Sequence, residues 1–135
     1  MGRNLGLWID HKQAYVIDEG AKEPVVIKSN VEPLTKHSGG TRAGGKFNLD
    51  SELRDYDRFQ HHLREYYHQV IAAIRDADRI LVFGPGEAKI ELEREIRKSK
   101  PLAKKLVGVE TAGKMTKNQM MAHVRKFYST KHRAV

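Results

Sequence analysis

The sequence predicts one α/β domain, in which a mixed sheet of five strands carries three helices. Three short β-rich runs lie within the first 30 residues, and the rest of the chain alternates helical and strand patterns. An antiparallel meander followed by alternating helices and strands is typical of a mixed α/β sheet. A length of 135 residues is usual for one domain, so we expect residues 1–135 to share a core.

The first strands are indicated by apolar runs that polar turns separate. Residues 5–10 and 14–18 flank a polar stretch, Asp10 to Gln13, that has the composition of a hairpin turn. A third run at 24–29 contains three consecutive β-branched residues. We therefore expect an antiparallel meander over the first 30 residues.

Helices and strands alternate in the second half. Between residues 51 and 74 apolar side chains recur at steps of three and four, which predicts an amphipathic helix of about six turns. Strands are expected at 80–83 and 106–109, with a helix from residue 87 to about 99 between them. Thr116 and Gln119 match a capping box that opens a third helix, through about residue 129. The polar tail at 130–135 is expected to fray.

Positive charge is concentrated in the last third of the chain. Of the 25 Lys and Arg residues, 11 lie from Arg97 onward against one acid, Glu110, so this part carries +10 and residues 1–96 carry −2. Such asymmetry is typical of a protein that binds a polyanion, although a solvated surface is the alternative. The candidate phosphate contacts in this part are Lys104, Lys105, Arg125 and Lys126.

Cysteine is absent, which excludes a disulfide framework and any thiolate metal site. No apolar run approaches the roughly 20 residues of a membrane span or resembles a signal peptide. We therefore expect a cytoplasmic protein that does not contact a membrane.

A glycine-rich segment at about 36–46 interrupts the regular patterns. Its glycine pairs allow positive φ angles and close approach of the backbone to a partner. Its basic residues have no acid beside them, so the segment is expected to be a mobile loop that contacts RNA, with a disordered linker as the alternative. The candidate RNA contacts here are Lys36, His37, Arg42 and Lys46.

Four other features are interpreted as having neither a catalytic nor a metal-binding role. The Gly-Pro-Gly sequence at 84–86 lacks the ending of a phosphate-binding loop, so it is expected to be a turn from strand to helix, without a nucleotide cofactor. The spacing of His61, Glu65 and His68 permits a metal triad, but a solvated or RNA-facing surface is the preferred interpretation, and no metal or cofactor is expected. Asp10 is interpreted as a turn former, and the single tryptophan, Trp8, as a core residue.

Three motifs in this order resemble the middle domain of archaeal and eukaryotic peptide-chain release factors and of Pelota. They are the opening hairpin at 7–17, the Gly-Gly segment from residue 36 with the long helix after it, and the strand ending in Gly-Pro-Gly with Lys89 three residues on. The resemblance spans roughly residues 5–110. It implies a stand-alone relative of that domain, which could be bacterial, with the ribonuclease H-like fold of translation-machinery proteins.

In those release factors, the glutamine of a GGQ loop positions water on the peptidyl-tRNA ester. Here Thr41 follows the first glycine pair and Lys46 follows the second, and which pair corresponds to the loop is left open. The loop candidates are therefore Gly39, Gly40, Thr41, Gly44, Gly45 and Lys46. We expect a ribosome- or tRNA-binding module with little or no catalysis. The alternatives are an ester hydrolase acting on peptidyl-tRNA without the glutamine, and a protein–protein adaptor.

Overall fold

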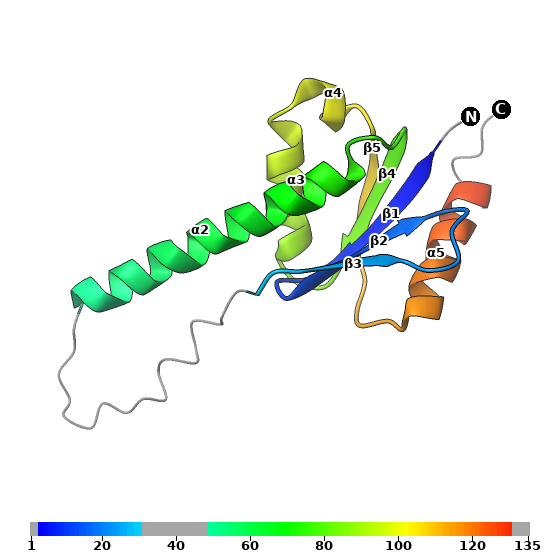
Figure 1. Cartoon of the computed structure of the whole chain (residues 1–135). Helices are drawn as coiled ribbons and strands as arrows, with labels where there is room; N and C mark the ends of the chain where they lie inside the picture. The colour runs from blue at the N-terminus through cyan, green and yellow to red at the C-terminus, as the bar shows by residue number, and fades with distance from the viewer. Residues whose placement is uncertain (1–2, 31–48, 131–135) are drawn as a thin grey trace.

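The computed structural model describes residues 3–30 and 49–130. The glycine-rich segment at 36–46 and the residues after 130 lie outside this part. The elements, in chain order, are β1 (Asn4–Ile9), β2 (Gln13–Asp18), β3 (Val25–Lys28), α2 (Leu49–Ile74), β4 (Arg79–Gly84), α3 (Ala88–Arg97), α4 (Lys100–Ala103), β5 (Leu106–Thr111) and α5 (Lys117–Thr130) (Figure 1).

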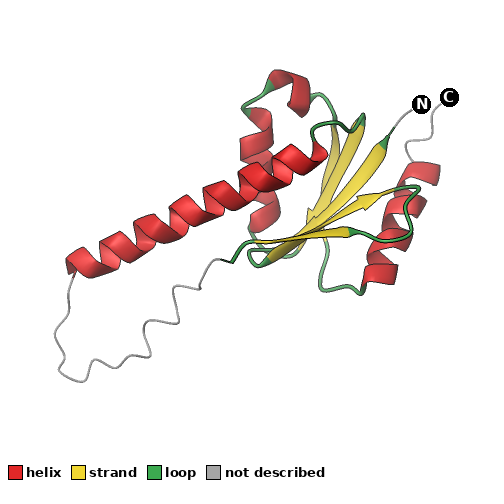
Figure 2. Ribbon diagram, viewed as in Figure 1, coloured by secondary structure: helices red, strands yellow, loops and turns green. Residues whose placement is uncertain are grey.

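The strands form one mixed sheet in the order β3-β2-β1-β4-β5 (Figure 2). The first three strands pair antiparallel, whereas β4 lies parallel to both β1 and β5. This confirms the predicted antiparallel meander and the predicted five-stranded mixed sheet. The central strand, β1, is therefore paired to a near neighbour in sequence on one side and to a distant strand on the other.

Helices cover both faces of the sheet. Successive residues of a strand point to opposite sides, and those of β1 are buried on both sides. Leu5, Leu7 and Ile9 of β1 pack with α2, α3 and α4 in one core cluster. Trp8 of the same strand packs with α5 in a second cluster. Figure 1 shows α2 and α3 on one side of the sheet and α5 on the other.

The contact between α5 and β1 depends on Gly6. A Cβ atom at this position would lie 2.2 Å from Cγ2 of Val124, far inside the contact distance of two carbon atoms. Val124 is fully buried in the cluster under α5. The missing side chain therefore allows α5 to approach the sheet backbone directly.

Helix α2 is longer than the sheet that it covers (Figure 1). Its C-terminal half buries Leu63, Val70 and Ile74 against the sheet. Farther toward the N-terminus, Leu53 and Tyr56 continue the apolar stripe but are 53% and 50% exposed. The predicted amphipathic helix is thus confirmed, and its first turns extend beyond the core.

Two turns have the structural roles expected from the sequence. In the β1–β2 turn, Oδ1 of Asp10 accepts hydrogen bonds from the backbone N–H groups of Lys12 and Gln13, both at 2.8 Å, which confirms Asp10 as a turn former. At the end of β4, Gly84 has φ 149°, and a Cβ there would lie 2.3 Å from the carbonyl oxygen of Ile9. This close passage of two backbones explains the glycine that begins the strand-to-helix turn.

The described residues contain one helix more than predicted. The expected helix from 87 to about 99 ends at Arg97 in the structure, and the single turn α4 follows it. Ser99 caps α4, since its Oγ accepts a hydrogen bond from the N–H of Leu102 at 3.4 Å. In the last helix the predicted capping box is confirmed. The Thr116 N–H donates to Oε1 of Gln119 at 2.9 Å, and the Gln119 N–H donates to Oγ1 of Thr116 at 3.1 Å.

In the described part of the chain, no helix has both the length and the apolar character that crossing a membrane requires.

Candidate nucleic-acid interface

The eight predicted RNA contacts fall into three groups. Lys36, His37, Arg42 and Lys46, like all the glycine-loop candidates, lie outside the described residues. Lys104 and Lys105 directly follow α4, whereas Arg125 and Lys126 lie on α5. Because α4 packs through Leu102 on one face of the sheet and α5 packs on the other, these two pairs lie on opposite faces. The structure does not bring all the C-terminal candidates onto one surface.

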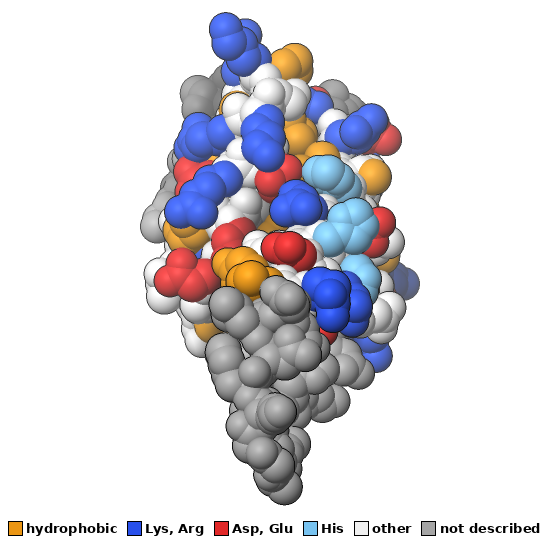
Figure 3. All heavy atoms as spheres, turned by 90° about the vertical axis from the view of Figure 1, so that its left-hand side faces the viewer, with side chains coloured by type: hydrophobic (Ala, Val, Ile, Leu, Met, Phe, Trp, Pro, Cys, Tyr) orange, Lys and Arg blue, Asp and Glu red, His pale blue; other side chains and the backbone are white. Residues whose placement is uncertain are grey.

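Within the described residues, the stretch of α3, α4 and the residues between them and β5 holds the largest number of cations in a short length. Residues 93–105 contain six basic and two acidic side chains. We call this the α3–α4 surface, and its basic residues are Arg94, Arg97, Lys98, Lys100, Lys104 and Lys105. Figure 3 shows many Lys and Arg side chains, with Asp and Glu side chains among them, over the upper part of the face that it draws, and a group of histidines next to them.

A groove of about 490 Å³ lies between α2 and the α3–α4 surface. Its apolar lining is made by Ile71 of α2 and by Pro101 and Leu102 of α4. The cations Arg75, Lys98 and Lys105 line the same groove, with His68, Glu95 and Ser99. The groove thus offers apolar contact area flanked by cations, an arrangement that suits the sugar–phosphate backbone of a nucleic acid.

Glu95 organises one side of the groove. Its carboxylate contacts the ammonium of Lys98 at 2.9 Å and Nε2 of His68 on α2 at 3.3 Å, and its side chain is only 14% exposed. Burial alone raises the pKa of Glu95, but the hydrogen bonds and charges of Lys98 and His68 outweigh burial, so the pKa lies below its ordinary value. Glu95 is therefore ionised at neutral pH and holds Lys98 and His68 in place between α2 and α3.

Lys105 has a structural contact as well as its charge. Its Nζ donates a hydrogen bond of 2.7 Å to the carbonyl oxygen of Arg75, one residue beyond α2. A lysine at this position stabilises the end of a helix, because carbonyl groups there lack partners within the helix. Lys104 is exposed. Of this predicted pair, Lys104 is therefore the residue whose charge is turned to solvent.

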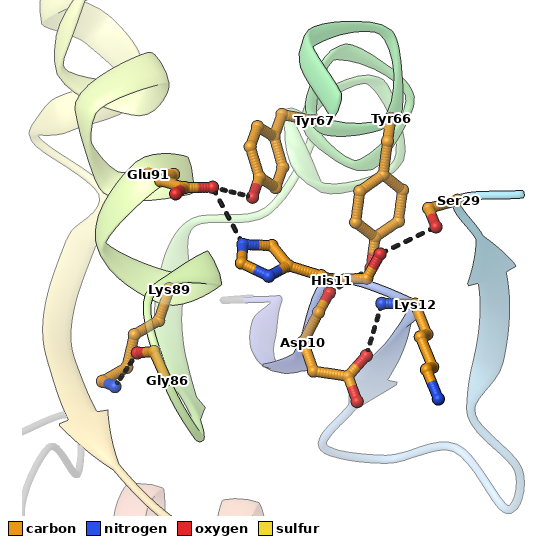
Figure 4. A network of polar contacts seen from close by, with 9 residues as sticks. All are labelled: Asp10, His11, Lys12, Ser29, Tyr66, Tyr67, Gly86, Lys89 and Glu91. Carbon is orange, nitrogen blue, oxygen red and sulfur yellow. Dashed lines mark hydrogen bonds and ion pairs between the residues drawn. The ribbon is translucent and has the colours of Figure 1, made fainter. Parts of the chain in front are cut away.

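A second polar network joins the β1–β2 turn to α2 and α3 (Figure 4). Oε1 of Glu91 accepts a hydrogen bond from the hydroxyl of Tyr67 at 2.5 Å and lies 3.0 Å from Nε2 of His11. The hydroxyl of Tyr66 donates to the carbonyl oxygen of Asp10 at 2.9 Å. Burial, the largest cause in both cases, raises the pKa of each tyrosine far above its ordinary value. Both hydroxyls thus remain protonated donors, and the network ties the turn to α2 and α3.

The Gly-Pro-Gly turn is closed by a buried lysine. Lys89 is 6% exposed, and its Nζ donates a hydrogen bond of 2.6 Å to the carbonyl oxygen of Gly86 (Figure 4). This contact spans the first turn of α3 and fixes the path of the chain between β4 and the helix. The motif therefore has the structural role that the sequence suggested.

The other interpretations made from sequence can be compared with the geometry. Over residues 3–30 and 49–130, no three His, Asp or Glu side chains are placed to hold a metal ion. His61 lies 3.4 Å from Glu65 on the same helix, while His68 contacts Glu95 of α3 instead. Trp8 is 3% exposed, which confirms it as a core residue, and its Nε1–H donates to the carbonyl oxygen of Gly113 at 3.1 Å.

The sequence reasoning missed the groove and its residues Arg75, Lys98 and His68 as parts of one site. The charges of Lys98 and Arg75 were visible in the sequence, but nothing local indicated that the end of α2 lies beside α4. The only available signal was Pro101 two residues after Ser99, a pattern that favours a helix start at that point.

No protein-family model and no curated protein sequence matches the chain. Among solved structures, the chain is similar to Pelota from Archaeoglobus fulgidus, with a TM-score of 0.57 and 12% sequence identity. The match covers 93% of this chain and 31% of that Pelota chain, so the present chain spans about a third of its structural neighbour. At this identity the likeness is one of fold, and it shows that the described part of the chain shares the fold of one part of Pelota.

Proposed function

We propose that this protein is a cytoplasmic, RNA-binding module of the translation machinery that contacts the ribosome or a tRNA with little or no catalysis. The α3–α4 surface and the glycine-rich segment at 36–46 are its contacts with RNA phosphates. The observation that carries the proposal is the α3–α4 surface itself, with six cations and two acids within 13 residues along one side of the fold.

The geometry of this surface supports the proposal. Its two acids are already engaged, since Glu93 pairs with Arg97 at 2.8 Å and Glu95 pairs with Lys98. Arg94, Lys100 and Lys104 are exposed. Each of these three charges can therefore neutralise a phosphate without first breaking one of those ion pairs.

The shared fold supports the translational context. The chain adopts the fold of part of Pelota, and the motifs that suggested release factors and Pelota occur along the same length of chain. An adaptor that binds another protein is the rival from a different class. If the protein is such an adaptor, its binding to a partner should not require RNA and should depend only weakly on the salt concentration.

The test is co-sedimentation of the purified protein with ribosomes, and binding of tRNA, over a series of salt concentrations. The variant Lys100→Ala/Lys104→Ala removes two exposed cations from the α3–α4 surface. Lys22→Ala/Arg64→Ala is the matched control, because it removes the same charge from exposed positions elsewhere.

The slope of log affinity against log salt concentration should become shallower by about 0.9 for each duplex phosphate that a variant no longer neutralises. We expect the slope to change by close to twice this amount in the α3–α4 variant, and by much less in the control. Equal effects of the two variants would reject the α3–α4 surface as the contact. Absence of any co-sedimentation or tRNA binding by the wild-type protein would reject the proposed function.

A further inference from the structure

A hollow of about 460 Å³ lies at the carboxyl end of the sheet, on the face that α5 covers. It is separate from the α3–α4 surface, which belongs to the opposite face. Its lining includes Trp8, Asp10, Lys12, Tyr15, Lys114 and Met115. Neither the composition of the chain nor its motifs indicated this site.

The inner wall of the hollow is a rigid aromatic platform. Tyr15 of β2 pairs directly with Trp8 of β1, and their rings meet edge to face with centroids 5.9 Å apart. Trp8 is fixed in turn by its hydrogen bond to Gly113. On the other side Tyr15 pairs with Val26, which is 42% exposed, so α5 leaves this part of the sheet face uncovered. Tyr15 itself is half-buried, so its ring is held in place while part of it stays accessible.

Two lysine side chains lie beside this platform. Lys12 and Lys114 both line the hollow and are both exposed. The one carboxylate in the lining, Asp10, uses Oδ1 to accept two backbone hydrogen bonds in the turn. The charge of the hollow is thus positive and complementary to phosphate.

The location is one where α/β folds bind ligands. The hollow is formed by the residues that follow β1 and β5, and ligands of open α/β sheets bind outside the carboxyl ends of the strands. Its volume falls within the roughly 300–1,000 Å³ usual for sites of small ligands. An aromatic ring flanked by cations is also how proteins hold an unstacked base of a single-stranded nucleic acid.

We propose that this hollow binds one unpaired nucleotide of the RNA, with the base on Tyr15 and the flanking phosphates at Lys12 and Lys114. This inference rests on the proposed function and specifies part of the ligand. Because the hollow and the α3–α4 surface lie on opposite faces of the sheet, they contact different parts of the RNA.

The only tryptophan of the chain is the reporter for this site. In an NMR spectrum of the nitrogen-15-labelled protein, Trp8 gives a single indole N–H signal. We would titrate the full chain with single-stranded RNA hexamers and with a duplex of the same length. The indole signal is expected to shift saturably with the single strands, and far less with the duplex, whose bases are already stacked.

Four variants distinguish stacking from charge. Tyr15→Leu keeps an apolar side chain but removes the ring, and should weaken hexamer binding about tenfold. Tyr15→Phe keeps the ring and should bind like the wild type, which also shows that the site tolerates a change at this position. Lys114→Ala should lower the salt dependence, whereas Lys22→Ala, an exposed lysine outside the hollow, should leave it unchanged.

Wild-type affinity in Tyr15→Leu, or an indole signal that hexamers do not move, would overturn the inference. If ribosomes still co-sediment in that case, the proposed function stands and only the nucleotide site is rejected. Saturable binding of hexamers without binding of ribosomes or tRNA would reject the proposed function and retain the site. A shift caused by an acidic peptide and not by RNA would overturn the assignment to a nucleotide.

Discussion

Replacing Gly6 by Ala tests the direct contact between α5 and the sheet. The new Cβ would lie 2.2 Å from Cγ2 of Val124, whereas carbon atoms in contact stand about 3.5–4.0 Å apart. Helix α5 must move outward or Val124 must leave its position. Overpacking of this kind costs about 1–3 kcal/mol, and we take about 2 kcal/mol as the expected reduction in the free energy of unfolding.

Val124→Ala provides the matching half of a double-mutant cycle. It removes both γ carbons from a fully buried side chain, which costs about 0.8 kcal/mol for each group in reduced burial and about 2 kcal/mol with the cavity that remains. In the double variant the new methyl group enters the space that the γ carbons leave. The nearest remaining atom, Cβ of Val124, is 3.1 Å away, so a small shift of α5 relieves the contact.

The two single effects sum to about 4 kcal/mol, and we expect the double variant to be destabilised by between about 2 and 3 kcal/mol. Urea unfolding of the four proteins gives these free energies from the transition midpoints and slopes. Gly20→Ala and Gly113→Ala are the controls, because no atom lies within 4 Å of a Cβ at either position. Single effects that add to within about 0.5 kcal/mol would refute the assigned contact.

The turn at Gly84, the ion pairs of Glu95 and the glycine-rich segment each give a further prediction. Gly84→Ala puts a side chain at φ 149° and 2.3 Å from the carbonyl oxygen of Ile9. It should lower the free energy of unfolding in urea by at least about 3 kcal/mol. An effect as small as that of Gly20→Ala would contradict this. Because the pKa of Glu95 is lowered on folding, its ionised form stabilises the fold at neutral pH, and this stabilisation is lost as the pH falls through 4.5 and below. Glu95→Gln should therefore lower the thermal midpoint at pH 7, with the difference from wild type shrinking below pH 4.5; a difference that is constant with pH would exclude this ion pair as the cause. The wild-type protein should release peptide from ribosomal peptidyl-tRNA far more slowly than a GGQ-bearing factor, because neither Thr41 nor Lys46 has the reach and amide of glutamine. A gain in Thr41→Gln or Lys46→Gln would identify the counterpart of that loop, whereas rapid release by the wild type, abolished in Gly40→Ala, would make the protein an enzyme.

The elements that the sequence predicted correctly are those that local patterns determine. The apolar spacing through Leu63, Val70 and Ile74 defines one face of α2, whatever that face packs against. The capping box of α5 and the Asp10 turn each lie within four residues of chain, so their hydrogen bonds could be foreseen. Helix α4 was missed because a single turn has no periodicity to detect.

The candidate sites could be predicted only in part, because they are assembled from distant segments. The excess of cations after Arg97 was visible in the sequence, but its division between two faces of the sheet depends on where α4 and α5 pack. The contact of His68 with Glu95 joins residues 27 positions apart, and that of His11 with Glu91 joins residues 80 apart. Helical spacing grouped His68 with its neighbours on α2 and could not indicate a partner on α3.

The central position of β1 has a consequence for how the chain folds as it is synthesised. Its antiparallel partner β2 follows it almost at once, but its parallel partner β4 pairs through residues about 75 positions later, as Asn4 with Arg79. At about 5–20 residues per second, one edge of β1 waits roughly 4–15 s for its partner. During this interval a nascent meander exposes unpaired backbone groups and the apolar side chains of the future core, the features that promote aggregation. The slow step of folding is therefore expected to be the closure of β4 onto β1.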